Sequence, residues 1–150
     1  GWRLGYAAGP KELIREMNKI HAYVVMSAPV MSQQAAIEAL RDDALCDEDI
    51  RGMREAYDER RKYLIGEFNR LGLTCFEPKG AFYVFPSIQK TVLGSEEFCE
   101  KLLFEGGVAV VPGNAFGECG EGFIRISYAY SMEELKVCIS KIERFLTKRN

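Results

Sequence analysis

Two arginines, Arg125 and Arg3, stand where their side chains could do chemistry. Arg125 lies in the middle of residues 123–128, an otherwise apolar run with the alternation of a β-strand. A guanidinium group keeps its charge at cellular pH, so an arginine covered by apolar neighbours requires an anion. Its planar donors match a carboxylate, which can come from a protein Asp or Glu or from a ligand. Arg3, between Trp2 and Leu4, raises the same question with a phosphate or a carboxylate as the anion.

Other kinds of catalytic site receive little support from the residue types. The single histidine, His21, lies on the apolar stripe of a predicted helix, where we expect a core or interface residue and no Ser/His/Asp or Cys/His set. The five cysteines are widely spaced and form no CxxC pair, which predicts free thiols and no metal site. The glycine-rich loop at 111–117 lacks the GxxxxGK[ST] order of a P-loop and indicates tight turns.

The composition argues against nucleic acid and membranes as partners. The formal net charge of the 150 residues is −2, and basic and acidic side chains are mixed along the predicted helices. No apolar run approaches the ~20 residues that a bilayer span requires, and nothing resembles a signal peptide. We therefore expect a cytoplasmic protein that binds neither DNA, RNA nor lipid.

The elements that must position the two arginines are helices interleaved with short strands. A first helix is predicted to begin at Pro10, and a second to turn Ile37, Leu40 and Ala44 inward. A third is predicted to be capped by Asp47 and to end at Gly72, a fourth to be capped by Ser95, and the last to be capped by Ser131 with Glu134 in a capping box. Apolar runs predict strands at 73–76, 81–85, 108–111 and 123–128. The predicted fold class is α/β (α+β), with a small mixed sheet covered by helices.

Four phrases in the sequence point to a family when they are taken in order. They are Gly-Trp-Arg-Leu-Gly-Tyr at 1–6, Pro-Lys-Gly-Ala-Phe-Tyr at 78–83, Val-Pro-Gly-Asn-Ala-Phe-Gly at 111–117 and Arg-Ile-Ser-Tyr-Ala at 125–129. In order and spacing the chain resembles the class I/II aminotransferases of the fold-type I pyridoxal-phosphate enzymes, from its first residue to its last helix.

The resemblance implies roles for individual residues. Arg3 matches the arginine that binds the cofactor phosphate, and Arg125 matches the one that binds the substrate α-carboxylate, which favours a ligand as its anion. Phe82 would line the substrate pocket, with Asn114 and Phe116 contributing more loosely. Residues 1–45 would be the end of the large domain and the interdomain helices, and 46–150 the C-terminal small domain. Family members are usually homodimers.

The resemblance also implies that this chain is a fragment. In the family, the lysine that forms a Schiff base with the cofactor shortly precedes the Gly-Trp-Arg motif, and the aspartate that faces the pyridine nitrogen lies further upstream. Both positions fall before Gly1, and none of the lysines present matches the family position. We therefore expect the parent protein to be the enzyme and this chain alone to be inactive.

Three functions remain open on the sequence. The first is an aminotransferase that moves an amino group between an amino acid and a 2-oxo acid through pyridoxal phosphate. The second is a carbon–sulfur lyase on the same scaffold, since fold does not fix chemistry. The third is the aminotransferase-like domain of a transcription regulator. The identity of the amino donor depends in part on residues before Gly1.

Overall fold

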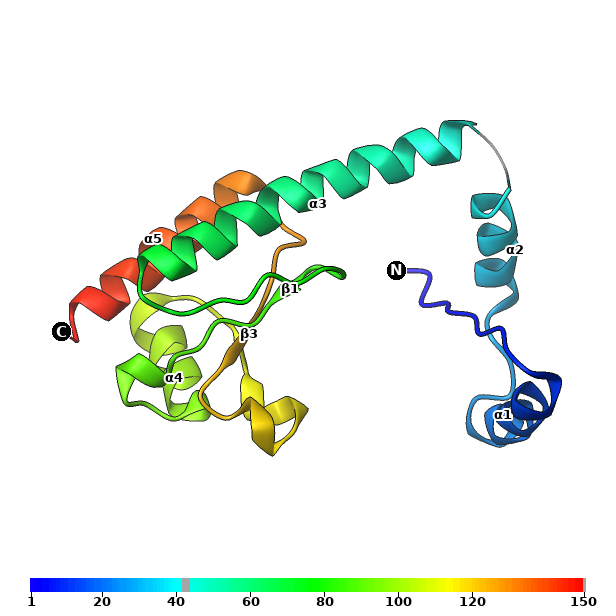
Figure 1. Ribbon diagram of the computed structural model, residues 1–150, viewed down its shortest axis with the longest axis horizontal. Helices are drawn as coiled ribbons and strands as arrows, with labels where there is room; N and C mark the ends of the chain where they lie inside the picture. Colours follow the sequence, from blue (N-terminus) through cyan, green and yellow to red (C-terminus); the bar gives the residue numbers. More distant parts are fainter. Residues whose placement is uncertain (42–43, 150) are drawn as a thin grey trace. The chain divides into compact units, whose positions relative to one another are not determined.

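The computed structural model describes residues 1–41 and 44–149, which divide into two compact units, Gly1–Arg51 and Gly52–Asn150 (Figure 1). Each unit is described by itself. The assignment of residues 1–45 to the end of the large domain and the interdomain helices, and of 46–150 to the small domain, stays a prediction.

The first unit consists of an extended segment followed by helices. Residues 1–10 are irregular, α1 spans Lys11–Val24, α2 spans Val30–Ala39, and α3 (Ala44–Arg70) continues into the second unit. Pro10 lies just before α1, as predicted, because its fixed φ of −54° suits a helix entry. The inward orientation predicted for Ile37 and Leu40 is wrong: their exposed fractions are 54% and 68%, because α1, α2 and residues 1–10 are too few to cover them. The same prediction for Ala44 concerns a side chain outside the described ones. His21 is also exposed.

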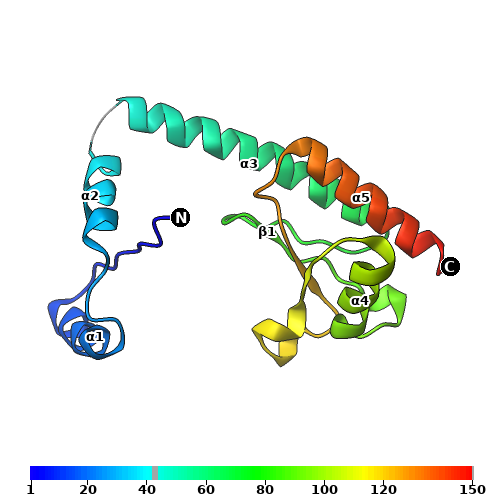
Figure 2. The same cartoon turned by 180° about the vertical axis from the view of Figure 1, so that it is seen from behind.

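Three helices build the second unit. The C-terminal part of α3 lies beside α5 (Met132–Thr147) in both views (Figures 1 and 2), and Arg70 Nη1 of α3 lies 2.7 Å from Glu143 Oε1 of α5. Ser131 and Glu134 form the predicted capping box at the start of α5. Gly72, with φ of +80°, ends α3 as predicted.

Two predicted helix caps differ from the structure. The helix α3 begins at Ala44, so Asp47 lies in its first turn, where its charge suits the helix dipole, and not at the cap. The helix α4 (Ser95–Lys101), continued by the π-helical turn η2 (Leu102–Gly106), has Gly94 at its cap. The Ser95 hydroxyl instead accepts a 2.8 Å hydrogen bond from Gly122 N, and the Glu121 carboxylate accepts one from Ser95 N, so a distant loop caps this helix.

The strands form a three-stranded sheet in the order β1-β3-β2. Both pairs, β1 (Tyr83–Val84) with β3 (Ile124–Ser127) and β2 (Val111–Pro112) with β3, are antiparallel, so the predicted fold class is confirmed while the sheet of the described residues is antiparallel rather than mixed. The strands are shorter than predicted, and prolines at 86 and 112 limit the ladders. Residues 73–76 form no strand; the Asn69 side chain binds the backbone of Cys75 instead.

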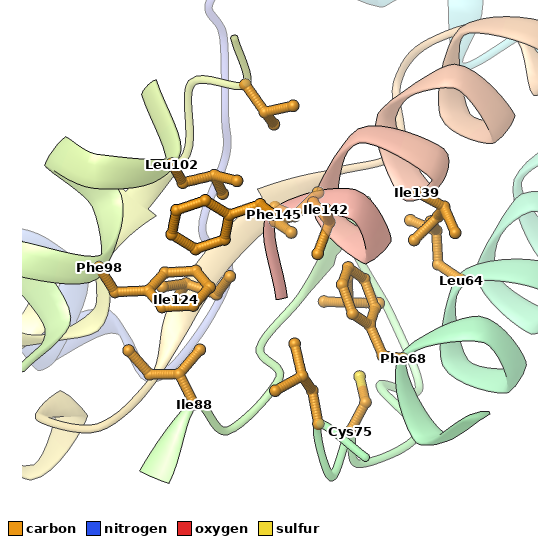
Figure 3. Packing of buried hydrophobic residues seen from close by; sticks show 14 of the residues in the cluster. Leu64, Phe68, Cys75, Ile88, Phe98, Leu102, Ile124, Ile139, Ile142 and Phe145 are labelled. Carbon is orange, nitrogen blue, oxygen red and sulfur yellow. The ribbon is translucent and has the colours of Figure 1, made fainter. Parts of the chain in front are cut away.

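The core lies against one face of β3. Ile124, Ile126 and Tyr128 are buried there, and they join a cluster drawn from α3, α4 and α5 (Figure 3) that includes Leu64, Phe68, Phe98, Ile139, Ile142 and Phe145. The alternate residues Phe123, Arg125 and Ser127 point to the opposite face and are half-buried. The alternation of this strand thus separates the core from Arg125.

No helix among the described residues is both long enough and apolar enough to cross a membrane.

Candidate functional site

Arg125 occupies the centre of the sheet face that points away from the core. It is opposite Val111 of β2 in the β3 ladder. Its Cζ atom lies 4.4 Å from the centre of the Tyr83 ring and 4.6 Å from the centre of the Phe116 ring. Both distances are within the range in which a cation is attracted to the face of an aromatic ring.

The guanidinium group of Arg125 has no acidic partner within residues 1–41 and 44–149. No Asp or Glu carboxylate of these residues lies within ion-pair distance of the guanidinium, and the guanidinium donates no hydrogen bond to any of these residues. By contrast, Arg61 and Arg70 each bind two carboxylates. The sequence left two sources of an anion for Arg125, a protein carboxylate or a ligand. No Asp or Glu in the described part of the chain is that anion. The donors of Arg125 are free to bind a planar anion.

Tyr83 reaches Arg125 through the register of β1 on β3. Tyr83 is paired with Ser127, two residues from Arg125 on the same face of the sheet. Its neighbour Val84 is 1% exposed and points into the core. Sequence reasoning did not assign a role to Tyr83. The alternation of residues 81–85 contained the signal, because it places Tyr83 and Val84 on opposite faces.

Phe116 is supplied by the loop that follows β2. This loop contains the short 3₁₀ turns η3 (Gly113–Phe116) and η4 (Glu118–Gly120). Gly113 N donates a 2.8 Å hydrogen bond to Phe123 O, and a Cβ atom at Gly113 would overlap the carbonyl oxygen of Gly120. The Phe116 ring also meets the Phe85 ring edge-on, with centroids 5.9 Å apart. The tight turns predicted for the glycine-rich loop therefore place an aromatic ring on Arg125.

Asn114, in the same loop, binds a neighbouring helix. Its Nδ2 donates a 3.3 Å hydrogen bond to Glu96 Oε1. Its Oδ1 is buried and has no protein partner in the described part of the chain.

Phe82 lies next to this site but makes different contacts. Its ring stacks on Tyr57 of α3 with centroids 6.0 Å apart, and it lies 4.6 Å from the Tyr83 ring. It is 39% exposed, so one side of the ring is accessible. Phe82 contacts Tyr83 rather than Arg125 in the described contacts, and its role in lining a pocket stays a prediction.

Arg3 belongs to the first unit and lies at a hollow of about 330 Å³ between residues 2–6 and α2. Its φ of +50° places it in the left-handed region, which is uncommon for a side chain of this kind. The preceding residue is held in place because Ser32 Oγ donates a 2.8 Å hydrogen bond to Trp2 O. Arg3 is exposed and forms no ion pair with the described residues. An exposed guanidinium with no carboxylate partner among the described residues can bind an anion.

Three buried or half-buried cysteines and the acidic residues of the described part of the chain provide no competing site. Burial raises the pKa of the Cys75 and Cys138 thiols and raises the pKa of Cys99 to about 11, so these thiols stay protonated and weakly nucleophilic at neutral pH. Within residues 1–41 and 44–149, no group of three or more His, Cys, Asp or Glu side chains is placed to hold a metal ion.

Comparison with known proteins gives one family over nearly the whole chain. The model of the family "Aminotransferase class I and II" matches residues 1–142. The chain is 46% identical over 147 residues to the aspartate aminotransferase of Pyrococcus horikoshii, covering 97% of this chain and 37% of that protein. It is 40% identical over 149 residues to the aromatic-amino-acid aminotransferase 2 of Thermococcus litoralis, covering 99% of this chain and 38% of that protein.

A solved structure supports the same relationship. The aromatic aminotransferase from Pyrococcus horikoshii superimposes with a TM-score of 0.88 at 44% identity, over 99% of this chain and 39% of that one. The chain thus spans a little over a third of the length of the relatives that it matches.

Proposed function

This chain belongs to the class I and II aminotransferases, and from that premise we propose that it is the C-terminal part of an enzyme that transfers an amino group between an amino acid and a 2-oxo acid. Its relatives include an aspartate aminotransferase and an aromatic-amino-acid aminotransferase. Both substrates of such a reaction carry a carboxylate beside the reacting carbon, so one fixed cation can orient both.

The observation that supports this proposal is that the guanidinium of Arg125 lacks a carboxylate partner among the described residues. Its guanidinium lies over the Tyr83 and Phe116 rings and has no acidic partner in the described part of the chain. Keeping a cation on a half-buried sheet face without an anion costs free energy. The carboxylate of a bound substrate would supply that anion. A carboxylate held by two parallel hydrogen bonds is also fixed in direction, which lowers the entropy that must be lost in reaching a reactive geometry.

Arg3 is proposed to bind the phosphate of pyridoxal phosphate, the cofactor of this family. The proposal rests on its guanidinium, which forms no ion pair with the described residues and lies at the hollow lined by residues 2–6 and α2. When bound, the cofactor supplies an electron sink for bond breaking at the substrate's α-carbon. This chain's own contribution is to bind two anions, one with each arginine.

Several finer features belong to the same proposal. Phe82, with Asn114 and Phe116, would line the substrate pocket. The whole protein would be a homodimer in the cytoplasm. Residues 1–45 would be the end of the large domain and the interdomain helices, and residues 46–150 would be the small domain. The lyase and transcription-regulator alternatives share the scaffold, but no contact in this structure favours either of them.

Substitution of Arg125 in the full-length protein tests the proposal. Arg125→Lys keeps a positive charge but removes the paired donors, and Arg125→Gln removes the charge. We expect the kcat/KM for L-aspartate or L-phenylalanine to fall about 10- to 1000-fold, the larger loss being with Arg125→Gln. Turnover of 2-phenylethylamine, which has no carboxylate, should change little. The exposed Arg144→Lys on α5 is the matched control. Unchanged kcat/KM for every carboxylate substrate would remove Arg125 from this role.

The proposal also holds that the 150-residue chain alone is inactive. None of its lysines corresponds to the family's cofactor-binding lysine. Borohydride treatment with pyridoxal phosphate should therefore attach pyridoxyl groups to surface lysines at scattered, substoichiometric levels, as read by peptide mass spectrometry. Stoichiometric attachment at one lysine would contradict the expected inactivity.

A further inference from the structure

Two aromatic rings meet the guanidinium of Arg125 from the two strands that flank β3. Tyr83 comes from β1 on one side, and Phe116 comes from the turn that follows β2 on the other side. The ring centres lie 4.4 and 4.6 Å from Cζ, so neither ring is a distant neighbour.

An aromatic ring supports a guanidinium group without using up its strongest donors. The face of a ring attracts the cation, but it offers no lone pair to the N–H groups that lie in the guanidinium plane. A carboxylate partner within the protein would occupy those same N–H groups. The rings therefore stabilise Arg125 and leave its hydrogen-bonding edge for another anion.

The rings also restrict the motion of Arg125. A free arginine side chain loses much conformational entropy when it is fixed, and a ligand that must fix it binds less tightly. The rings themselves are held in place. Tyr83 is fixed by its pairing with Ser127, and Phe116 by the turn whose Gly113 is packed against Gly120. The fixed backbone thus determines where the guanidinium lies before any substrate arrives.

We infer that Tyr83 and Phe116 are positioning residues for the carboxylate of the substrate, acting through Arg125. The inference rests on the proposed aminotransferase function and deepens it. The two rings set the affinity for the carboxylate and leave the reacting carbon untouched. Their removal should weaken the binding of every carboxylate substrate to a similar degree, whatever its side chain.

The test uses the full-length protein with Tyr83→Leu, Tyr83→Phe and Phe116→Leu. We expect both leucine variants to raise the KM for L-aspartate and L-phenylalanine about 3- to 30-fold with a smaller change in kcat. The Kd of 3-phenylpropanoate, a carboxylate that cannot react, should rise by the same factor. Tyr83→Phe keeps the ring and should behave as the wild type. In the leucine variants, the kcat/KM for 2-phenylethylamine, which has no carboxylate, should fall less than the kcat/KM for L-phenylalanine.

Phe123→Leu is the matched control. Phe123 lies on the same face of the sheet, and its ring meets Phe85, 6.1 Å away, rather than Arg125. Phe116 is 51% exposed, so its truncation leaves the core intact and gives a readable result even if Tyr83→Leu does not fold.

The outcomes separate this inference from the proposed function. If Arg125→Gln abolishes carboxylate selectivity while Phe116→Leu, Tyr83→Leu and Phe123→Leu all behave alike, the positioning role is wrong and the function stands. If Arg125→Gln itself leaves selectivity unchanged, the proposed function fails. If the leucine variants lose kcat/KM equally for 2-phenylethylamine and for L-phenylalanine, the rings support only the fold, and the inference is overturned.

Discussion

The hydroxyl group of Tyr128 donates a 2.9 Å hydrogen bond to the carbonyl oxygen of Ala81, 47 residues earlier in the chain. Tyr128 is 1% exposed, and its backbone N–H donates a second 2.9 Å bond to Phe82 O. Ala81 has a φ of +58°, so these bonds hold a strained residue two positions before β1. The position of Tyr83 two residues later depends on them.

Tyr128→Phe should lower the free energy of unfolding by about 1 kcal/mol, because the carbonyl of Ala81 loses its partner while the ring remains. Urea denaturation followed by circular dichroism measures the change. Tyr130→Phe, at a residue that is 57% exposed, serves as the comparison and should leave the midpoint unchanged. Identical midpoints for the two variants would show that the Tyr128 hydroxyl contributes nothing.

Gly113→Ala should destabilise the second unit by about 3 kcal/mol or more, because overpacking against fixed backbone forces the loop to move. The added Cβ would overlap Gly120 O and lie 2.7 Å from Phe123 O, and neither atom belongs to a flexible side chain. Thermal unfolding of the chain measures the loss. Gly66→Ala in α3 is the control: nothing lies within 4 Å of its added Cβ, so helix propensity should raise stability by about 0.5–1 kcal/mol. A tolerated Gly113→Ala would contradict the packed loop.

The cysteines should differ sharply in their reaction with a thiol reagent at pH 8. Cys119 is exposed, whereas burial raises the pKa of Cys75 and raises that of Cys99 to about 11. We expect Cys119 to react rapidly in the folded chain, and Cys75 and Cys99 to react only after unfolding. Cys119→Ser should remove the fast phase. One common rate for all thiols in the folded chain would be inconsistent with the buried positions.

Stability should fall as the pH is lowered below about 4.5, in part through the ion pairs of Arg61. The Arg61 side chain is 15% exposed and binds both Asp58 and Glu77. Hydrogen bonds from Lys62 and Arg61 lower the pKa of Asp58, and one from Arg61 lowers the pKa of Glu77. Since both carboxyl groups have lower pKa values when folded, their contribution is present above the unfolded pKa and is lost as pH falls through the folded pKa.

The Glu77→Gln variant tests this explanation. Its urea midpoint should be lower than that of the wild type at pH 7, and the two midpoints should converge as the pH approaches 3. A constant difference between them across this range would exclude titration of Glu77 as the cause.

The sequence predicted most of the helices, because periodic apolar residues and local capping signals define them. The capping box of Ser131 and Glu134 is such a case, since both partners lie within one helical turn. Ser95 was wrongly predicted as the cap of α4, of which it is the first residue. Its backbone N–H is bound by Glu121, which is 26 residues away, and no local signal contains that contact. Strand lengths failed for the same reason: pairing depends on distant residues.

At the site, the family resemblance selected Arg125, and strand alternation supplied the physical reason. Tyr83 was not selected, because its importance comes from its register with Ser127, which only the fold supplies. The exposure of the apolar stripe of α1 could not be anticipated either, since helical periodicity shows that a face is apolar but not what covers it.

The alternation along β3 has a consequence for how such proteins can diversify. Its inward residues pack in the core, while its outward residues are available to contact a molecule that binds on the other face. Substitutions that retune recognition on the outward face can therefore accumulate without a matching repair of the interior. Because one face of this four-residue strand packs in the core and the other contacts ligands, new substrate preferences can arise through single substitutions on the outward face.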